Sequence, residues 1–215
     1  MKTLRIEHAV ELNDKSLRFV DDYFDHHLHF GYIDMLNWPR EFPYKPMVRF
    51  KAVRSDSKLY LKYYVVEKSI RAIWNNDQDP VWTDSCVEFF FRPSEADFYY
   101  NFEFNCIGTC LATQRKGRNE VVVPLSAEQL NAIARFPSLG TKPFEEKSGL
   151  TEWKLTVEIP LEIIGLNSEN LRQKATANFY KCGDETKSPH YLSWNHIQTE
   201  KPDFHRPEFF GEIIF

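Results

Sequence analysis

The sequence predicts an all-β protein, an antiparallel β-sandwich of the jelly-roll or immunoglobulin-like two-sheet type with a few short helices. Three observations predict it: apolar residues recur at every second position in the well-patterned segments, at least seven such segments follow one another, and helix signals are few. The 215 residues suit one domain. We therefore expect a single unit over residues 1–215, with residues 1–45 as an N-terminal lead-in packed on it.

The clearest strand signal lies in residues 151–159 (TEWKLTVEI), where large apolar side chains alternate strictly with polar or charged ones. Such alternation is typical of an antiparallel strand with one buried face. Pro46–Val53 alternates in the same way, and Lys58–Val66 is rich in Tyr, Leu and Val, residues that suit a pleated surface. The remaining strand candidates are Cys86–Arg92, Phe98–Cys106, Ala175–Tyr180 and Glu212–Phe215.

Three short helical segments are expected between these strands. Ser126 is suited to cap a helix over Ala127–Arg135, because its hydroxyl can accept a hydrogen bond from the first turn. Leu17–Phe24 is a second candidate. Pro160–Gly165 predicts a single turn that begins with a proline and ends at a glycine.

The charge balance and hydropathy exclude two classes of partner. The chain has 27 basic and 31 acidic residues scattered along its length, so it lacks the basic stripe of a nucleic-acid-binding protein. No stretch approaches the roughly 20 apolar residues of a membrane span. Charges from Arg5 onward interrupt the start, so we expect no secretory signal in this chain and a cytoplasmic location if the chain is full length. The oligomeric state stays open.

The four cysteines, Cys86, Cys106, Cys110 and Cys182, do not have the paired spacing of a zinc site. We expect buried free thiols, with a Cys106–Cys110 disulfide as the alternative.

Two segments combine a tryptophan with polar side chains near a strand end: residues 75–88 (NNDQDPVWTDSCVE) and 192–198 (LSWNHIQ). A loop so rich in Asp and Asn is costly to bury, so Trp82 is expected at a rim. Glu88 alternates with Val87 and Phe89, which places it on the face opposite the core. An exposed indole can pack on the flat C–H face of a pyranose, while carboxylates and amides hydrogen-bond its hydroxyls. The pattern favours carbohydrate binding.

At these residues the sequence resembles the carbohydrate-binding module family 9 domains, and more closely the bacterial stand-alone family 9-like members of the DOMON-like group. The resemblance runs from about Pro46 to Phe215. It rests on VWTDSCVEFFFRP (81–93), FYYNFEFNCIGT (98–109) and the C-terminal SWNHIQTEKPDFHRPEFFGEIIF (193–215). It implies a two-sheet β-sandwich that binds a mono- or oligosaccharide without cleaving it.

The resemblance also implies site residues. Trp82, six residues before Glu88, would stack on a sugar, and Trp194 with Asn195 would close the other face. Asp84 and Asn105 would order the hydroxyls. Where the family has an arginine two residues before this asparagine, the chain has Glu103. Arg118, or else Arg71, is then expected to supply the missing cation.

Two alternatives accompany this hypothesis. Glu88 and Glu103 on adjacent predicted strands could form the carboxyl pair of a glycoside hydrolase. The loss of the arginine could instead mark a scaffold domain whose sugar cleft has decayed and filled. Independently of function, Asp77 and Asp79 offer oxygen ligands for structural calcium, although the loop lacks the regular D-x-D-x-D-G pattern. No other cofactor is expected.

Overall fold

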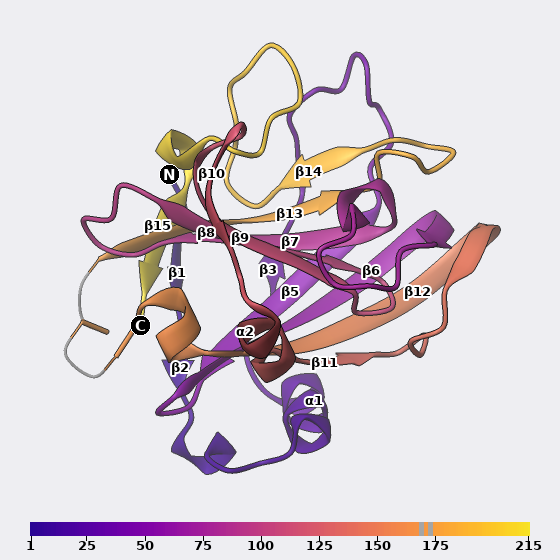
Figure 1. The fold of residues 1–215 in the computed structure, drawn as a ribbon. Coiled ribbons are helices and arrows are strands. Elements are labelled where there is room, and N and C mark those ends of the chain that lie inside the picture. The colour runs from indigo at the N-terminus through magenta and orange to yellow at the C-terminus, as the bar shows by residue number, and fades with distance from the viewer. Residues whose placement is uncertain (168–169, 172–173) are drawn as a thin grey trace.

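The computed structural model describes residues 1–167, 170–171 and 174–215. Two sheets pack face to face, and short helices lie at their margins (Figure 1). The predicted antiparallel β-sandwich is thus confirmed. Within these residues no helix has both the length and the apolar character needed to cross a membrane.

The larger sheet carries nine strands in the described chain. In spatial order they are β1 (Thr3–Arg5), β15 (Gly211–Ile214), β13 (Ala175–Cys182), β7 (Cys86–Arg92), β8 (Tyr99–Asn105), β9 (Cys110–Gly117) and β10 (Glu120–Pro124), with β14 (Tyr191–Ser193) on β13 and β4 (Met35–Leu36) on β14. Its centre is antiparallel. The three central strands that the sequence predicts, β7, β8 and β13, lie side by side here.

The smaller sheet has six strands among the described residues: β11 (Ala134–Pro137), β12 (Phe144–Pro160), β6 (Lys58–Ala72), β5 (Met47–Arg54) and β2 (Glu7–His8) in order, with β3 (Gly31–Tyr32) on β5. The predicted strands β5, β6 and β12 are confirmed. β6 and β12 extend well past the alternating segments, because their polar ends pair with each other across two register shifts. That pairing satisfies backbone groups without needing buried side chains.

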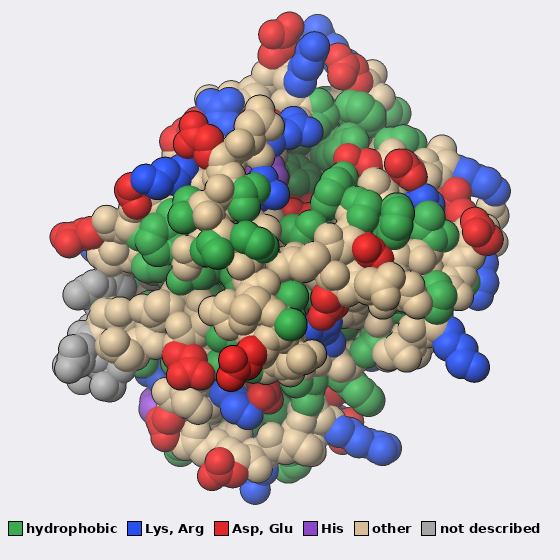
Figure 2. All heavy atoms as spheres, in the orientation of Figure 1, with side chains coloured by type: hydrophobic (Ala, Val, Ile, Leu, Met, Phe, Trp, Pro, Cys, Tyr) green, Lys and Arg blue, Asp and Glu red, His purple; other side chains and the backbone are tan. Residues whose placement is uncertain are grey.

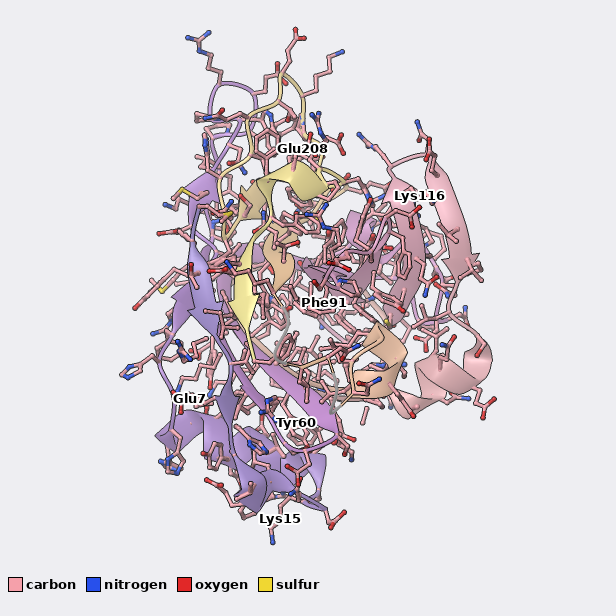
Figure 3. All side chains as sticks on the ribbon, turned by 90° about the vertical axis from the view of Figure 1, so that its left-hand side faces the viewer. Glu7, Lys15, Tyr60, Phe91, Lys116 and Glu208 are labelled. Atoms are coloured by element: carbon pink, nitrogen blue, oxygen red, sulfur yellow. The ribbon has the colours of Figure 1, made fainter. Side chains whose placement is uncertain are left out.

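The core fills the space between the sheets and contains many of the aromatic residues. Phe50 of β5 stacks on Phe179 of β13 with ring centroids 3.9 Å apart, which joins the two layers. Phe89 and Phe102 stack within the larger sheet. In Figure 3, Phe91 lies in the interior of the molecule, whereas Lys116 and Glu208 lie toward the surface.

The helices follow the predicted signals, with one shorter than expected. α1 (Leu17–His26) is capped by the Ser16 hydroxyl and packs on the outer face of the smaller sheet through Val20 and Phe24. α2 (Ala127–Ala132) begins at Ser126 with a capping box. It ends three residues earlier than predicted because the chain turns into β11 and pairs with β12. The single turn η3 (Leu161–Ile164) ends at Gly165 in the left-handed region.

The first 45 residues do not only pack on the sandwich; they also form part of its sheets. β1 pairs in parallel with β15, and β2 pairs in parallel with β5. The N-terminal segment therefore contributes edge strands to both sheets, in addition to the helix that covers one of them.

Candidate functional site

The outer face of the larger sheet carries acidic groups at its centre. Period-two alternation turns Val87 and Phe89 of β7 into the core, and Glu88 outward. Glu103 of β8 is the direct cross-strand partner of Glu88. Both glutamates are almost fully buried even though they face away from the core, because loops and an apolar layer around Tyr99, Tyr180 and Phe204 cover this face.

A cavity of about 230 Å³ opens above the two glutamates. Its lining residues are Trp82, Glu88, Glu103, Arg115, Arg118, Asn119, Cys182, Asp184, Tyr191, Pro202, Asp203, Phe204 and His205. Figure 2 shows a hollow above the centre of the face, with charged and histidine side chains inside it and hydrophobic side chains around it. Strands β7, β8 and β13 thus supply the floor, and β9, β14 and connecting segments supply the walls.

Burial raises the pKa of three carboxyl groups of the cavity. It raises the pKa of Glu103 to about 7, and it raises the pKa of Glu88 well above the ordinary value, with the negative charge of Glu103 adding to the effect. Burial likewise raises the pKa of Asp184 to about 6. These groups can therefore act as hydrogen-bond acceptors or, when protonated, as donors near neutral pH.

The opposite wall provides donors. Arg115 of β9 bonds the Thr113 hydroxyl at 2.9 Å and the Arg118 carbonyl at 2.6 Å, which holds the β9–β10 turn at the cavity edge. Burial lowers the pKa of His205 to about 3, and Arg115 and Arg118 add to that effect. The imidazole is therefore neutral at physiological pH, with its Nδ1 2.8 Å from the Tyr99 hydroxyl oxygen.

The structure brings four of the predicted site residues together at this cavity: Trp82, Glu88, Glu103 and Arg118. Trp82 lies in the turn η2 (Val81–Thr83), and 38 % of it is exposed, as expected for a rim position. Arg118 therefore places a cation at the cavity, as expected, and Arg115 places a second one there. Arg71 is elsewhere, paired with Asp84 and Glu185.

Trp194 does not lie at the cavity, and the predicted clamp of Trp82 and Trp194 is corrected by its position. Only 4 % of Trp194 is exposed, and its ring packs edge-on against Phe50 and Phe179 in the core. The polar neighbours of Trp194 in the sequence do not indicate its burial, because the rings that pack on it belong to other strands, β5 and β13. The cavity aromatic nearest to it in the sequence is Tyr191.

Gly211 provides a test of the buried position of Trp194. A Cβ at Gly211 would lie 2.4 Å from Cζ3 of Trp194 and 2.8 Å from the Lys2 carbonyl oxygen. We expect Gly211→Ala to lower the free energy of unfolding by about 1–3 kcal/mol through overpacking. Gly117→Ala is the matched control, because a Cβ there meets nothing within 4 Å. Urea denaturation of both variants measures the effect, and equal stabilities would contradict this packing.

Three further predicted ligand groups are also occupied by the protein itself. The Asp84 carboxylate is fully buried and accepts hydrogen bonds from Arg71, two backbone amides and Asn105. Asn105 donates to the Trp74 carbonyl and accepts from two backbone amides. Asn195 is bonded to Lys2 and Phe209. Their roles are structural: none of the three lines the cavity, and each holds a loop in place.

The two aspartates expected as calcium ligands have protein partners. Both oxygens of Asp77 accept from the Arg135 guanidinium, at 2.7 and 2.9 Å, and Oδ1 also accepts from the Cys110 amide. Asp79 accepts from the backbone and side chain of Asn76. Calcium binding at this loop stays a prediction.

Sequence reasoning missed most of the cavity wall. Arg115 was detectable in principle, because it follows Leu111 and Thr113 on the outward face of β9. Asp184, Tyr191 and His205 lie in loops or at a short strand, where no periodicity applies. All four cysteines are free and buried, which confirms that expectation.

The fold and the cavity together describe a β-sandwich with a cavity on the outer face of one sheet. The sequence matches the profile of carbohydrate-binding family 9 over residues 19–215. The chain therefore belongs to carbohydrate-binding family 9.

Solved structures agree with this membership. A Bacteroides uniformis protein provisionally described as carbohydrate-binding is 36 % identical, with a TM-score of 0.92 over 99 % of this chain and 98 % of that one. A family 9 module from Caldicellulosiruptor kristjanssonii in complex with cellotriose is 11 % identical, with a TM-score of 0.56 over 99 % and 93 %. The module with glucose is 12 % identical, with a TM-score of 0.51 over 99 % and 95 %. At 11 % and 12 % identity, the two module structures show a similar fold and nothing further about this chain. No curated protein sequence matches the chain.

Proposed function

We propose that this protein binds carbohydrate without cleaving it and that the cavity beside Trp82 holds one sugar residue. The observation that carries the proposal is an exposed indole at the rim of an open cavity that is lined by carboxylates and arginines. The apolar face of a pyranose would pack on Trp82, and Tyr191 lies on the cavity wall as a second aromatic. Membership of a carbohydrate-binding family supports this assignment.

The polar groups suit hydroxyls because they offer both donors and acceptors. Glu88, Glu103 and Asp184 can accept, and Arg115 and Arg118 can donate. The cavity volume of about 230 Å³ is below the roughly 300–1,000 Å³ of pockets for drug-sized ligands. This size favours one terminal sugar residue over a long internal stretch of polysaccharide. The open space also argues against a decayed and filled cleft.

Calorimetric titration with a panel of mono- and oligosaccharides, including glucose and cellotriose, tests the proposal. We expect saturable binding, and we expect Trp82→Ala to weaken it about 30-fold, since truncating a central aromatic contact costs about 2 kcal/mol. Phe136→Ala is the control: Phe136 is similarly exposed, at 41 %, but does not line the cavity. The absence of a binding signal with every sugar, or wild-type affinity in Trp82→Ala, would refute the assignment.

The second candidate is glycoside hydrolysis by Glu88 and Glu103. It is favoured by their direct cross-strand pairing and by a Glu103 pKa of about 7, which suits a general acid. Assaying the same panel for new reducing ends separates the two functions. If reducing ends are released by the wild-type protein and not by Glu88→Gln, hydrolysis is established. If sugars bind and no reducing ends are released, the protein is a binding module.

A further inference from the structure

Two cysteines and a glutamate meet at the floor of the cavity. Cys86 of β7 and Cys182 of β13 are direct cross-strand partners, and Glu88 is the next outward residue on β7. The two sulfurs and a Glu88 carboxylate oxygen all lie within 4.8 Å of one another. Cys182 Sγ is 3.0 Å from Glu88 Oε1. The two strands thus present three potential metal ligands on one side.

These separations suit a tetrahedral ion after small side-chain adjustments, in which Cys182 Sγ and Glu88 Oε1, now 3.0 Å apart, move slightly away from each other. Zinc–sulfur bonds of about 2.3 Å and zinc–oxygen bonds of about 2.0–2.2 Å place neighbouring ligand atoms roughly 3.3–3.8 Å apart. The ligands come from paired central strands, which constrain their backbone positions. Cys182 and Glu88 also line the cavity, so an ion has a route from solvent.

Glu103 supplies an independent indication of a missing cation. Its Oε1 accepts from Asn101 at 2.8 Å. Its Oε2 is buried, and within the described part of the chain no hydrogen bond reaches it. Arg115 lines the same cavity, but in that same part of the chain no hydrogen bond or ion pair joins it to Glu88 or Glu103. A buried carboxylate oxygen without a partner is costly and calls for a ligand.

We propose that Cys86, Cys182 and Glu88 form a site for Zn²⁺ on the cavity floor. Two sulfur ligands favour zinc over calcium or magnesium, which prefer oxygen ligands alone. On binding, each thiol releases its proton to solvent and donates a sulfur lone pair to the ion. The three side chains leave the fourth tetrahedral position for an oxygen, from Glu103 or from a molecule in the cavity.

Cobalt titration of the reduced protein tests this site, because Co²⁺ occupies zinc sites and its thiolate complexes absorb in the near ultraviolet. We expect one Co²⁺ per chain, a thiolate-to-cobalt band, and loss of that band when Zn²⁺ is added. Cys182→Ser and Cys86→Ser should each abolish the wild-type spectrum. Cys106→Ser and Cys110→Ser are matched controls, since both residues are buried in the core away from this cluster, and should retain the spectrum.

A measurement on the wild-type protein keeps the proposal testable if a cysteine variant fails to fold. X-ray absorption of the zinc-loaded protein should show two sulfur ligands and the rest oxygen. A shell without sulfur, or a cobalt spectrum unchanged in Cys182→Ser, would overturn the assignment. Neither readout depends on sugar binding, so the result stands apart from the proposed function.

Discussion

Lys181→Met is expected to lower the free energy of unfolding by about 3–5 kcal/mol, because it leaves the buried carboxylate of Glu67 without its cation. Both side chains are completely buried, and Lys181 Nζ lies 3.1 Å from Glu67 Oε2. Lys181 belongs to β13 and Glu67 to β6, so this ion pair joins the two sheets through the core.

The groups around the pair are also satisfied, which explains why its disruption is costly. Glu67 Oε1 accepts from Trp153 Nε1 at 2.6 Å. Lys181 Nζ donates to the Cys182 carbonyl at 2.7 Å and to His190 Nε2 at 2.8 Å. Because a lysine ammonium can only donate, His190 accepts through Nε2. Burial lowers the pKa of His190 well below its ordinary value, with Lys181 adding to the effect, in agreement with a neutral ring.

Urea denaturation followed by tryptophan fluorescence measures the loss, and the double variant Lys181→Met/Glu67→Gln identifies its cause. The double variant should be more stable than Lys181→Met alone, because glutamine removes the unpaired charge and still accepts from Trp153. Lys116→Met is the surface control: its ion pair with Asp97 is exposed, and its unfolding midpoint should not move measurably. If the stability lost in the double variant equalled the sum of the losses in the two single variants, the broken ion pair would not be the cause of the destabilisation.

Asp84→Ala is expected to cost a similar amount, about 3–5 kcal/mol. Its carboxylate is fully buried and accepts from Arg71 Nη1 at 2.7 Å, from the amides of Ile73 and Trp74 at 3.2 and 3.1 Å, and from Asn105 Nδ2 at 3.0 Å. Alanine would leave two backbone amides and a guanidinium without this acceptor. Each buried group left unsatisfied costs free energy.

Thermal and urea denaturation of Asp84→Ala and Asp84→Asn measure this effect. Asparagine keeps one acceptor oxygen and should lose less stability than alanine. Asp97→Ala, which removes an exposed surface carboxylate, should leave the unfolding midpoint unchanged. If Asp84→Ala instead kept wild-type stability and only weakened sugar binding, Asp84 would be a ligand group after all.

Local patterns predicted the strands well because alternation is a property of neighbouring residues. The Cys86–Arg92 strand begins and ends where the sequence places it, and Glu88 faces outward as its alternation requires. The Ser126 cap at the start of α2 was an equally local signal. Strand β10 was not predicted, because Val121–Val123 is exposed and does not alternate.

What the sequence by itself determined is the sandwich, the outward face of β7 and the exposed position of Trp82, since each depends on residues adjacent in the chain. Only the tertiary structure decided which side chains meet. Trp194 is buried because Phe50 of β5, Phe179 of β13 and Gly211 of β15 pack against it. Cys182 joins Glu88 because β13 pairs with β7 almost a hundred residues away. Contacts between residues far apart in the sequence arise when the strands assemble into sheets. The periodicity of a single segment does not predict them.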